Sequence, residues 1–429
     1  MSARVLRGWV VDFASGKTKD WRNGAVVVGK DGRISWVGAH ARMPKSYAGL
    51  AIDDYGDRLI LPGLIDPHIH FPQYRILAAP GKDLLDWLNR FTFPEEARYR
   101  SKAHAAKAAE LFLDRLAAHG TTSTMAFCSV HKACADALFS AAEKRNMALV
   151  SGKTMMDRNA PANVLDDAET GGRDSQALID KWHGRGRLRY AVTPRFAVTS
   201  SEAQLAVSGE LLKDHPDCLM QTHISESPGE IEFVKQQFPK SKDYTDVYDS
   251  FGLLGPTSLF AHAIHLSERE CSRMSETGSA VLHCPTSNNF LGSGLFRYPH
   301  LAEQDRPVGV GIATDVGGGT SYSMLQTLGE AYKVAMLVGH KFTAAELFAM
   351  ATAGNAARLH LAGEIGSLSA GKWADAIVLD PGATAVMAAR HDVSRSLEDI
   401  LFSLVILGDD RAIRATYIAG KRVHGKKPR

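Results

Sequence analysis

The chain has 429 residues, of which 45% are hydrophobic and 23% are charged, and its formal net charge is +3. This length and hydrophobic content are sufficient for a large core with a smaller accessory domain. The small net charge argues against a nucleic-acid or membrane-surface protein. No apolar run reaches the roughly 18 residues of a membrane span. The five cysteines include no CxxC pair, so we expect no disulfide framework and a reduced, cytoplasmic setting.

The order of apolar and polar residues predicts two kinds of structure along the chain. Residues 1–57 contain short β-type segments joined by glycine-rich turns. From residue 59 to about residue 361, short apolar strands alternate with amphipathic helical runs. The eight strand candidates in this region cover residues 59–66, 122–127, 148–156, 188–195, 218–225, 258–264, 280–285 and 308–315. Eight strand–helix repeats over about 300 residues predict an α/β fold of the (β/α)8 TIM-barrel type.

After the barrel region the chain returns to β-type segments, and this return suggests how the domains are arranged. We expect residues 1–57 and 364–429 to form one small, discontinuous, β-sandwich-like domain. The metal-dependent barrel, residues 58–363, would then be inserted between the two parts.

Histidine and acidic residues follow several predicted strands at the end where barrel active sites lie. His68 and His70 are one residue apart, so both side chains lie on one face of an extended strand. His223 ends the fifth predicted strand and Asp315 ends the eighth. Three histidines and one carboxylate with an open coordination position suit one catalytic divalent ion, most simply zinc.

Each of these residues also has a structural interpretation. A lone HxH pair is more often structural than metal-binding, His223 alone could be a core histidine, and Asp315 could cap the following helix. Their joint placement at the ends of separate strands favours the metal site. Lys153 on the third predicted strand could bridge a second metal, but we expect a mononuclear site.

Two further side chains are candidates for the chemistry beside the metal. Glu226 follows His223 by three residues and can act as a general acid and base without being a ligand. His262 is favoured over His265 because it directly follows the apolar run 258–261. His283 precedes a Cys-Pro pair and is expected to be structural.

Several stretches carry a resemblance to a known family. "PGLIDPHIH", "THISES", "AHAIHLSERE" and "GVGIATDVGGGTS" resemble the metal-dependent amidohydrolase superfamily in its deaminase branch. "HFPQY", "LLDWLNRFTFPEE", "GKTMMDRNAP", "AVTPRF", "HCPTSNNFLGSGLF" and "SMLQTLGEAYKV" are similar to stretches of the guanine deaminases. The likeness covers roughly residues 59–361. The HxH pair and the aspartate are common to many amidohydrolases, whereas the PQY, TPRF and FTFPE stretches are far more specific.

The resemblance implies a zinc-dependent hydrolysis of guanine to xanthine and ammonia, with one zinc ion per subunit of a homodimer. The zinc ligands that it implies are His68, His70, His223 and Asp315. It implies that Glu226 transfers a proton to the purine ring and that Asp315 accepts a proton from the attacking water. His262 would hold the attacking oxygen.

Gln73, Arg195 and Phe196 are expected to bind the base, mostly because of the resemblance. Arg195 offers only donors, so it suits the O6 carbonyl of guanine and mismatches the amino group of adenine. Gln73 can donate and accept, which suits a lactam edge, and Phe196 can stack on a purine. The structural alternatives are a salt bridge at the barrel rim for Arg195 and core packing for Phe196.

Two other classes of function remain as alternatives. The first is an amidohydrolase that acts on another oxo-purine, a pterin or another heterocycle, and the second is a non-catalytic barrel scaffold. The H-x-E and P-C-x-x-C signature of nucleic-acid deaminases is absent, so a free small base is the expected substrate. Segments 71–100 and 285–306 are candidate walls or lids, in which Trp87 and Phe93 could seal the ligand or pack against the barrel.

Overall fold

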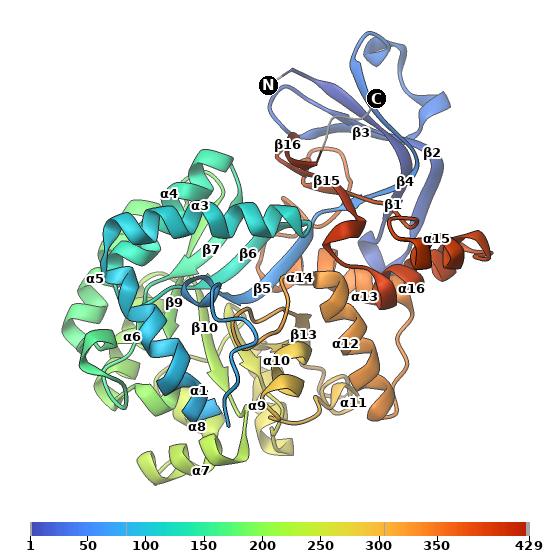
Figure 1. Cartoon of the computed structure of the whole chain (residues 1–429). Coiled ribbons are helices and arrows are strands. Elements are labelled where there is room, and N and C mark those ends of the chain that lie inside the picture. Colours follow the sequence, from blue (N-terminus) through green and yellow to red (C-terminus); the bar gives the residue numbers. More distant parts are fainter. Residues whose placement is uncertain (1, 83, 304, 426–429) are drawn as a thin grey trace.

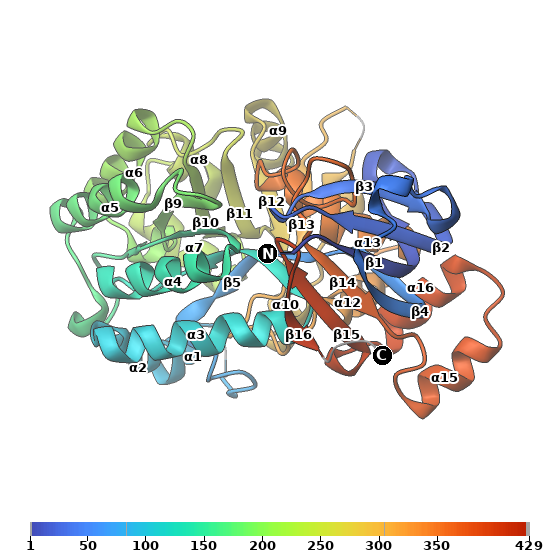
Figure 2. The same cartoon turned by 90° about the horizontal axis from the view of Figure 1, so that it is seen from above.

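The computed structural model describes residues 2–82, 84–303 and 305–425. A barrel of parallel strands surrounded by helices forms one part of the molecule, and a separate sheet built from both ends of the chain forms the other (Figure 1). Figure 2 shows the two parts side by side from above, with the first and last strands of the chain in one layer. None of the helices in the described residues is long and apolar enough to cross a membrane.

The barrel contains eight parallel strands in chain order, which confirms the predicted (β/α)8 fold. They are β5 (Leu64–His70), β6 (Thr121–Phe127), β7 (Ala148–Gly152), β9 (Leu188–Pro194), β10 (Leu219–Ile224), β11 (Ser258–His262), β12 (Ala280–His283) and β13 (Gly309–Ile312). A short strand, β8 (Thr154–Met155), follows β7 and pairs with β9. Near the strand starts the interior is filled by an apolar cluster that includes Ile65, Leu219, Leu259 and Leu359. Polar side chains are therefore left to the opposite end of the barrel.

Hydrogen bonds between the first strand and the segment after the last strand close the barrel. The backbone N–H of His70 donates to the carbonyl of Val316 at 2.7 Å, and that of Asp315 donates to the carbonyl of His68 at 2.9 Å. The Asn355 side-chain amide donates to the carbonyls of β5 and β13 at Ile65 and Ile312, each at 2.8 Å. These contacts bring the histidine pair and the aspartate to the same place although about 245 residues separate them in the sequence.

Helices follow most of the strands, and each buries one apolar stripe. In α3 (Lys102–Ala118) the buried residues Ala105, Ala109, Phe112 and Leu116 recur at intervals of three or four, as expected for a helix that covers the barrel. The other helices around the barrel are α4 (Lys132–Arg145), α5 (Ala168–Trp182), α6 (Glu202–Asp214), α7 (Pro228–Gln237), α8 (Tyr244–Asp249), α9 (Glu268–Thr277), α10 (Pro285–Phe290), α11 (Tyr298–Leu301), α12 (Met324–Leu337), α13 (Ala344–Ala349) and α14 (Asn355–Arg358). Between β5 and α3 the described residues form five short helical pieces: η4 (Phe71–Gln73), α1 (Leu84–Trp87), η5 (Leu88–Thr92), α2 (Phe93–Glu96) and η6 (Ala97–Arg100).

The second sheet joins strands from the two ends of the chain. Its order is β16-β15-β14-β4-β1-β2-β3. The strands are β1 (Arg4–Asp12), β2 (Lys19–Val28), β3 (Ile34–Ala39), β4 (Ala51–Pro62), β14 (Ala376–Leu379), β15 (Ile413–Ile418) and β16 (Lys421–Gly425). Helices α15 (Ala385–Asp392) and α16 (Leu397–Leu407) lie between β14 and β15 in the chain. Residues 426–429 of the expected accessory domain lie outside the described residues.

The junction between the two parts differs from the expectation. Residues 59–66 were predicted as one barrel strand, but Leu59–Pro62 belong to β4 and pair with β14 in the second sheet, so the prediction is wrong there. Only at Leu64 does the chain enter the barrel. Gly63 lies between the two strands, where a Cβ atom would come within 2.1 Å of the Thr122 hydroxyl oxygen, so only glycine fits. We therefore propose Gly63 as the boundary between the two units, in place of residues 57 and 58.

Candidate active site

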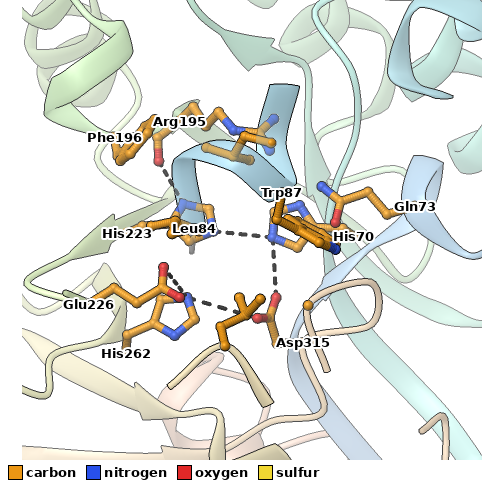
Figure 3. A pocket seen from close by; sticks show the side chains of 13 residues that line it. His70, Gln73, Leu84, Trp87, Arg195, Phe196, His223, Glu226, His262 and Asp315 are labelled. Atoms are coloured by element: carbon orange, nitrogen blue, oxygen red, sulfur yellow. Dashed lines mark hydrogen bonds and ion pairs between the residues drawn. The ribbon is translucent and has the colours of Figure 1, made fainter. Parts of the chain in front are cut away.

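The four predicted metal ligands lie together at the carboxyl end of the barrel strands. His68 and His70 end β5, His223 lies in β10, and Asp315 follows β13; all four are buried. The Nε2 atoms of His68 and His70 lie 3.2 and 3.3 Å from Asp315 Oδ1. Nε2 of His70 also lies 3.1 Å from Nε2 of His223. Figure 3 shows His70, His223 and Asp315 pointing toward one another.

The chemistry of this donor set fits a divalent cation. Tetrahedral zinc with bonds of about 2.0–2.1 Å places its ligand atoms about 3.3 Å apart, close to the separations found here. Burial lowers the pKa of His70 to about 3 and that of His223 well below its ordinary value, so both rings are neutral. Within the part of the chain that the structure describes, both ring nitrogens of His68 and Nδ1 of His70 are buried and form no regular hydrogen bond, although Nε2 of His68 faces Asp315. Neutral imidazoles are the form that binds metal, and a cation would satisfy the converging nitrogens.

The remaining ring nitrogen of His223 connects the candidate metal ligands to a candidate base-binding residue, Arg195. Nδ1 of His223 donates to the backbone carbonyl of Arg195 at 2.7 Å, which leaves Nε2 as the free lone pair. The hydroxyl of Thr222 donates to the same carbonyl at 3.1 Å. The carbonyl of Arg195 therefore orients a candidate metal ligand, while its side chain is available for another role.

Backbone strain marks three of the strand ends that carry site residues. Ser225, His262 and Asp315 have φ values of 48°, 70° and 50°, in the left-handed region that non-glycine residues rarely adopt. Each follows or ends a barrel strand. Such a conformation costs about 1–3 kcal/mol, and residues that adopt it are often found at functional sites.

Glu226 and His262 lie beside the candidate metal ligands. Glu226 Oε2 is 3.4 Å from His262 Nε2, and Ser293 donates to Glu226 Oε1 at 3.3 Å. Burial, and then the negative charge of Asp315, raises the pKa of Glu226 to about 8, so this carboxyl group holds a proton at neutral pH. Asn288 Oδ1 accepts from Nδ1 of His262 at 2.8 Å and fixes the ring with Nε2 toward Glu226.

A cavity opens over these groups at the carboxyl end of the barrel strands. Gln73, Arg195 and Phe196, the candidate base-binding residues, line it (Figure 3). Its other lining residues are His70, Leu84, Trp87, Leu88, His223, Glu226, His262, Leu291, Asp315 and Gly318. The structure thus brings all of the predicted site residues to one cavity, except that His68 lies beneath it against Asp315.

Besides His68, four residues from the sequence analysis do not line this cavity. Lys153 forms a buried ion pair with Asp166. His265 donates to the Ser293 carbonyl at 2.8 Å, and the ring of His283 stacks on Phe296 with centroids 4.2 Å apart. Phe93 is buried behind Arg195, whose guanidinium carbon lies 5.6 Å from its ring centroid. Trp87, in contrast, is a wall of the cavity.

Sequence reasoning missed two residues that hold the site together. Glu96 is fully buried and contacts both Arg195 and Gln73, and Asn288 holds His262. Both lie in stretches that carry the family resemblance, "LLDWLNRFTFPEE" and "HCPTSNNFLGSGLF". The resemblance of these stretches was the one signal available, because each stretch contains several other polar side chains and the sequence does not show which of them is buried.

Comparison with known proteins places this site in a family. The model of a family described as the amidohydrolase family matches residues 59–423. The chain belongs to the amidohydrolase family. Amidohydrolases are typically metal-dependent, in agreement with the donor set described above.

Three relatives are similar over nearly the whole chain. Guanine deaminase of Escherichia coli (strain K12) is 45% identical over 399 residues, which are 92% of this chain and 90% of that protein. The structure of guanine deaminase from Bradyrhizobium japonicum superposes with a TM-score of 0.96 at 36% identity, covering 99% of this chain and 100% of that one. Guanine deaminase from C. acetobutylicum, with guanine bound in its active site, gives a TM-score of 0.89 at 30% identity over 98% of this chain and 100% of that one.

Proposed function

We propose that this amidohydrolase removes the amino group of guanine by hydrolysis, giving xanthine and ammonia. The observation that carries the proposal is the shared cavity, in which a metal-type donor set faces a base-binding pair, Arg195 and Gln73. The 45% identical guanine deaminase and the relative with guanine bound support the same substrate.

We propose that one Zn²⁺ ion per chain is held by His68, His70, His223 and Asp315, whose ligand atoms converge. Three imidazoles and one carboxylate are a donor set that suits zinc. The chemistry that zinc supplies in such a site is a hydroxide nucleophile at neutral pH.

Glu226 is the proposed proton donor to the ring. Its carboxyl group is buried and holds a proton at neutral pH, and it lines the cavity beside His262. Carbon 2 of guanine bears the amino group and is flanked by ring nitrogens, so protonation of the adjacent nitrogen makes this carbon more electrophilic. Once deprotonated, Glu226 can take the proton from the hydroxyl group that has added to carbon 2 and pass it to the departing amine, which leaves as ammonia while the carbonyl forms.

Asp315 and His262 are placed to act on the attacking water. Asp315 Oδ2 lies 3.9 Å from His262 Nε2, so both groups face the same small region of the cavity. We propose that Asp315 accepts the proton that the water releases and that His262 holds the oxygen while charge develops on it.

Arg195, Gln73 and Phe196 are the proposed base-binding residues. The guanidinium of Arg195 has free donors for the O6 carbonyl of guanine, and Gln73 supplies an amide to the neighbouring ring edge. Phe196 lines the same side of the cavity and offers an aromatic surface for the purine.

The finer features of the protein are proposals as well. We propose a homodimer, because the exposed apolar side chains Met336, Leu337, Val386 and Val393 would be protected by association. We propose a cytoplasmic location because all five cysteines carry free, buried thiols. Light scattering of the purified protein tests the first, and fractionation of the source cells tests the second.

Ammonia release tests the function. The zinc-loaded protein is given guanine, with adenine, cytosine and 8-oxoguanine in parallel. We expect fast release from guanine, with xanthine as the second product. Activity on another base without activity on guanine would retain the hydrolytic chemistry and refute the base-binding assignment, and no activity on any base would refute the proposal.

A further inference from the structure

One carboxylate accepts hydrogen bonds from both of the proposed polar base-binding residues. Glu96, the last residue of α2, has no exposed side-chain surface. Its two oxygens each accept from Nη1 of Arg195 at 2.9 Å. Its Oε1 also accepts from Nε2 of Gln73 at 2.8 Å. Glu96 does not line the cavity, so it acts on a ligand only through these two side chains.

The contact with Glu96 determines which end of the Gln73 amide faces the ligand. A carboxylate paired with an arginine can only accept hydrogen bonds, so the NH₂ group of Gln73 must point toward Glu96. Oε1 of Gln73 then points away; it is buried and has no partner in the described residues. Rotating the amide would place oxygen against oxygen, which costs the hydrogen bond and adds repulsion between buried groups.

The contact with Glu96 also fixes the position of the Arg195 guanidinium. Glu96 uses Nη1 alone, so the remaining N–H groups of the guanidinium can donate toward the cavity. Figure 3 shows the Arg195 side chain above the histidines and that of Gln73 beside His70, and both line the same cavity. The cavity wall therefore carries one fixed donor group, the guanidinium of Arg195, and one fixed acceptor, Oε1 of Gln73.

We infer that Glu96 is a specificity-determining positioning residue, which selects purines with a lactam edge by fixing Gln73 as an acceptor and by holding the donors of Arg195 in place beside it. This inference rests on the proposed function. In a lactam, a ring N–H lies beside a C=O group, which matches this pair. An amino-purine offers a bare ring nitrogen beside an NH₂ group, so that acceptor would face acceptor and donor would face donor.

The test compares guanine with 2,6-diaminopurine. Both carry the same amino group at carbon 2, so the bond to be broken is unchanged, and only the edge at carbon 6 differs. In Glu96→Gln the neutral amide can donate as well as accept, which frees Gln73 to rotate. We expect kcat/KM for guanine to fall about 10- to 100-fold, chiefly through KM, and the preference for guanine over 2,6-diaminopurine to fall at least about tenfold.

Glu95→Gln is the matched control, because Glu95 is the adjacent residue of the same helix. Its carboxylate pairs with Arg98 at 2.9 Å and with Arg75 at 3.6 Å, and it contacts neither Gln73 nor Arg195 among the described residues. We expect Glu95→Gln to keep the wild-type preference. Bound zinc and the thermal midpoint are measured for every variant, so that loss of folding is separated from loss of specificity.

Glu96→Asp covers the case in which Glu96→Gln fails to fold. Aspartate keeps the charge beside Arg195 but is too short to reach Gln73 as well, so the preference should fall in the same direction. An unchanged preference in the folded variants, whether or not guanine activity falls, would overturn the inference. A wild-type protein that deaminates neither purine would instead refute the proposed function and this inference with it.

Discussion

The hydroxyl of Tyr248 links the two halves of the candidate site. Tyr248, in α8, accepts from the backbone N–H of Ala197 at 2.9 Å and donates to the carbonyl of His223 at 2.8 Å. The Thr222 hydroxyl lies 3.1 Å away. One phenol thus connects the segment after Arg195 and Phe196 to the strand that carries a candidate metal ligand.

Tyr248→Phe removes this link without changing the size of the ring. The buried N–H of Ala197 is left without a partner, which costs about 1–3 kcal/mol of stability. If the link also positions the site, about 1–2 kcal/mol of transition-state stabilisation is lost, and kcat/KM for guanine falls about 5- to 30-fold. Steady-state turnover of guanine and thermal melting measure the two effects separately.

Tyr190→Phe is the matched control for this prediction. The hydroxyl of Tyr190 accepts from the backbone N–H of Lys153 at 3.2 Å, so this variant also leaves one buried N–H without its partner. Tyr190 does not line the cavity. We expect a similar loss of stability with wild-type kinetics. Equal loss of activity in the two variants, or wild-type turnover in Tyr248→Phe, would refute a positioning role.

Three further predictions follow from the site. Gly317→Ala should raise KM for guanine about tenfold, because its Cβ would lie 2.6 Å from Cβ of Gln73; Gly229→Ala, where a Cβ meets nothing within 4 Å, is the control in the same assay. Burial, and then the nearby carboxyl group of Glu226, raises the pKa of Glu230 from 4.5 to about 7. The folded state therefore holds a proton that the unfolded state has lost, and stability should fall by up to about 3 kcal/mol as pH rises from 4.5 to 7. Thermal melts at pH 5 and 7 should show a smaller fall in Glu230→Gln. Chelation should abolish guanine turnover, zinc should restore it, and metal analysis should give one ion per chain.

The barrel and the candidate metal ligands could be predicted from local sequence signals. Strands β5, β10 and β13 are short apolar runs, and their polar residues come where each run ends. Because the carboxyl ends of parallel strands share one rim, His70, His223 and Asp315 were expected to meet although they are far apart in sequence. This inference needs only the strand pattern and the topology.

Other features depend on tertiary contacts that no local pattern encodes. Glu96 lies 99 residues from Arg195, and its role arises only where α2 packs behind the cavity. Tyr248 lies in a helix with no motif, and its hydroxyl acts through backbone groups of other segments. The junction at Gly63 was missed because the apolar run 59–66 continues through it, and pairing with β14 divides that run.

A crystal structure of the zinc-loaded protein with the product xanthine tests the central claim most directly. The account predicts a metal ion about 2.0–2.2 Å from the nitrogens of His68, His70 and His223 and from an Asp315 oxygen. It also predicts xanthine in the same cavity, with Arg195 donating to a carbonyl and Gln73 Oε1 accepting from a ring N–H. A metal bound elsewhere, or xanthine bound away from Arg195 and Gln73, would contradict it.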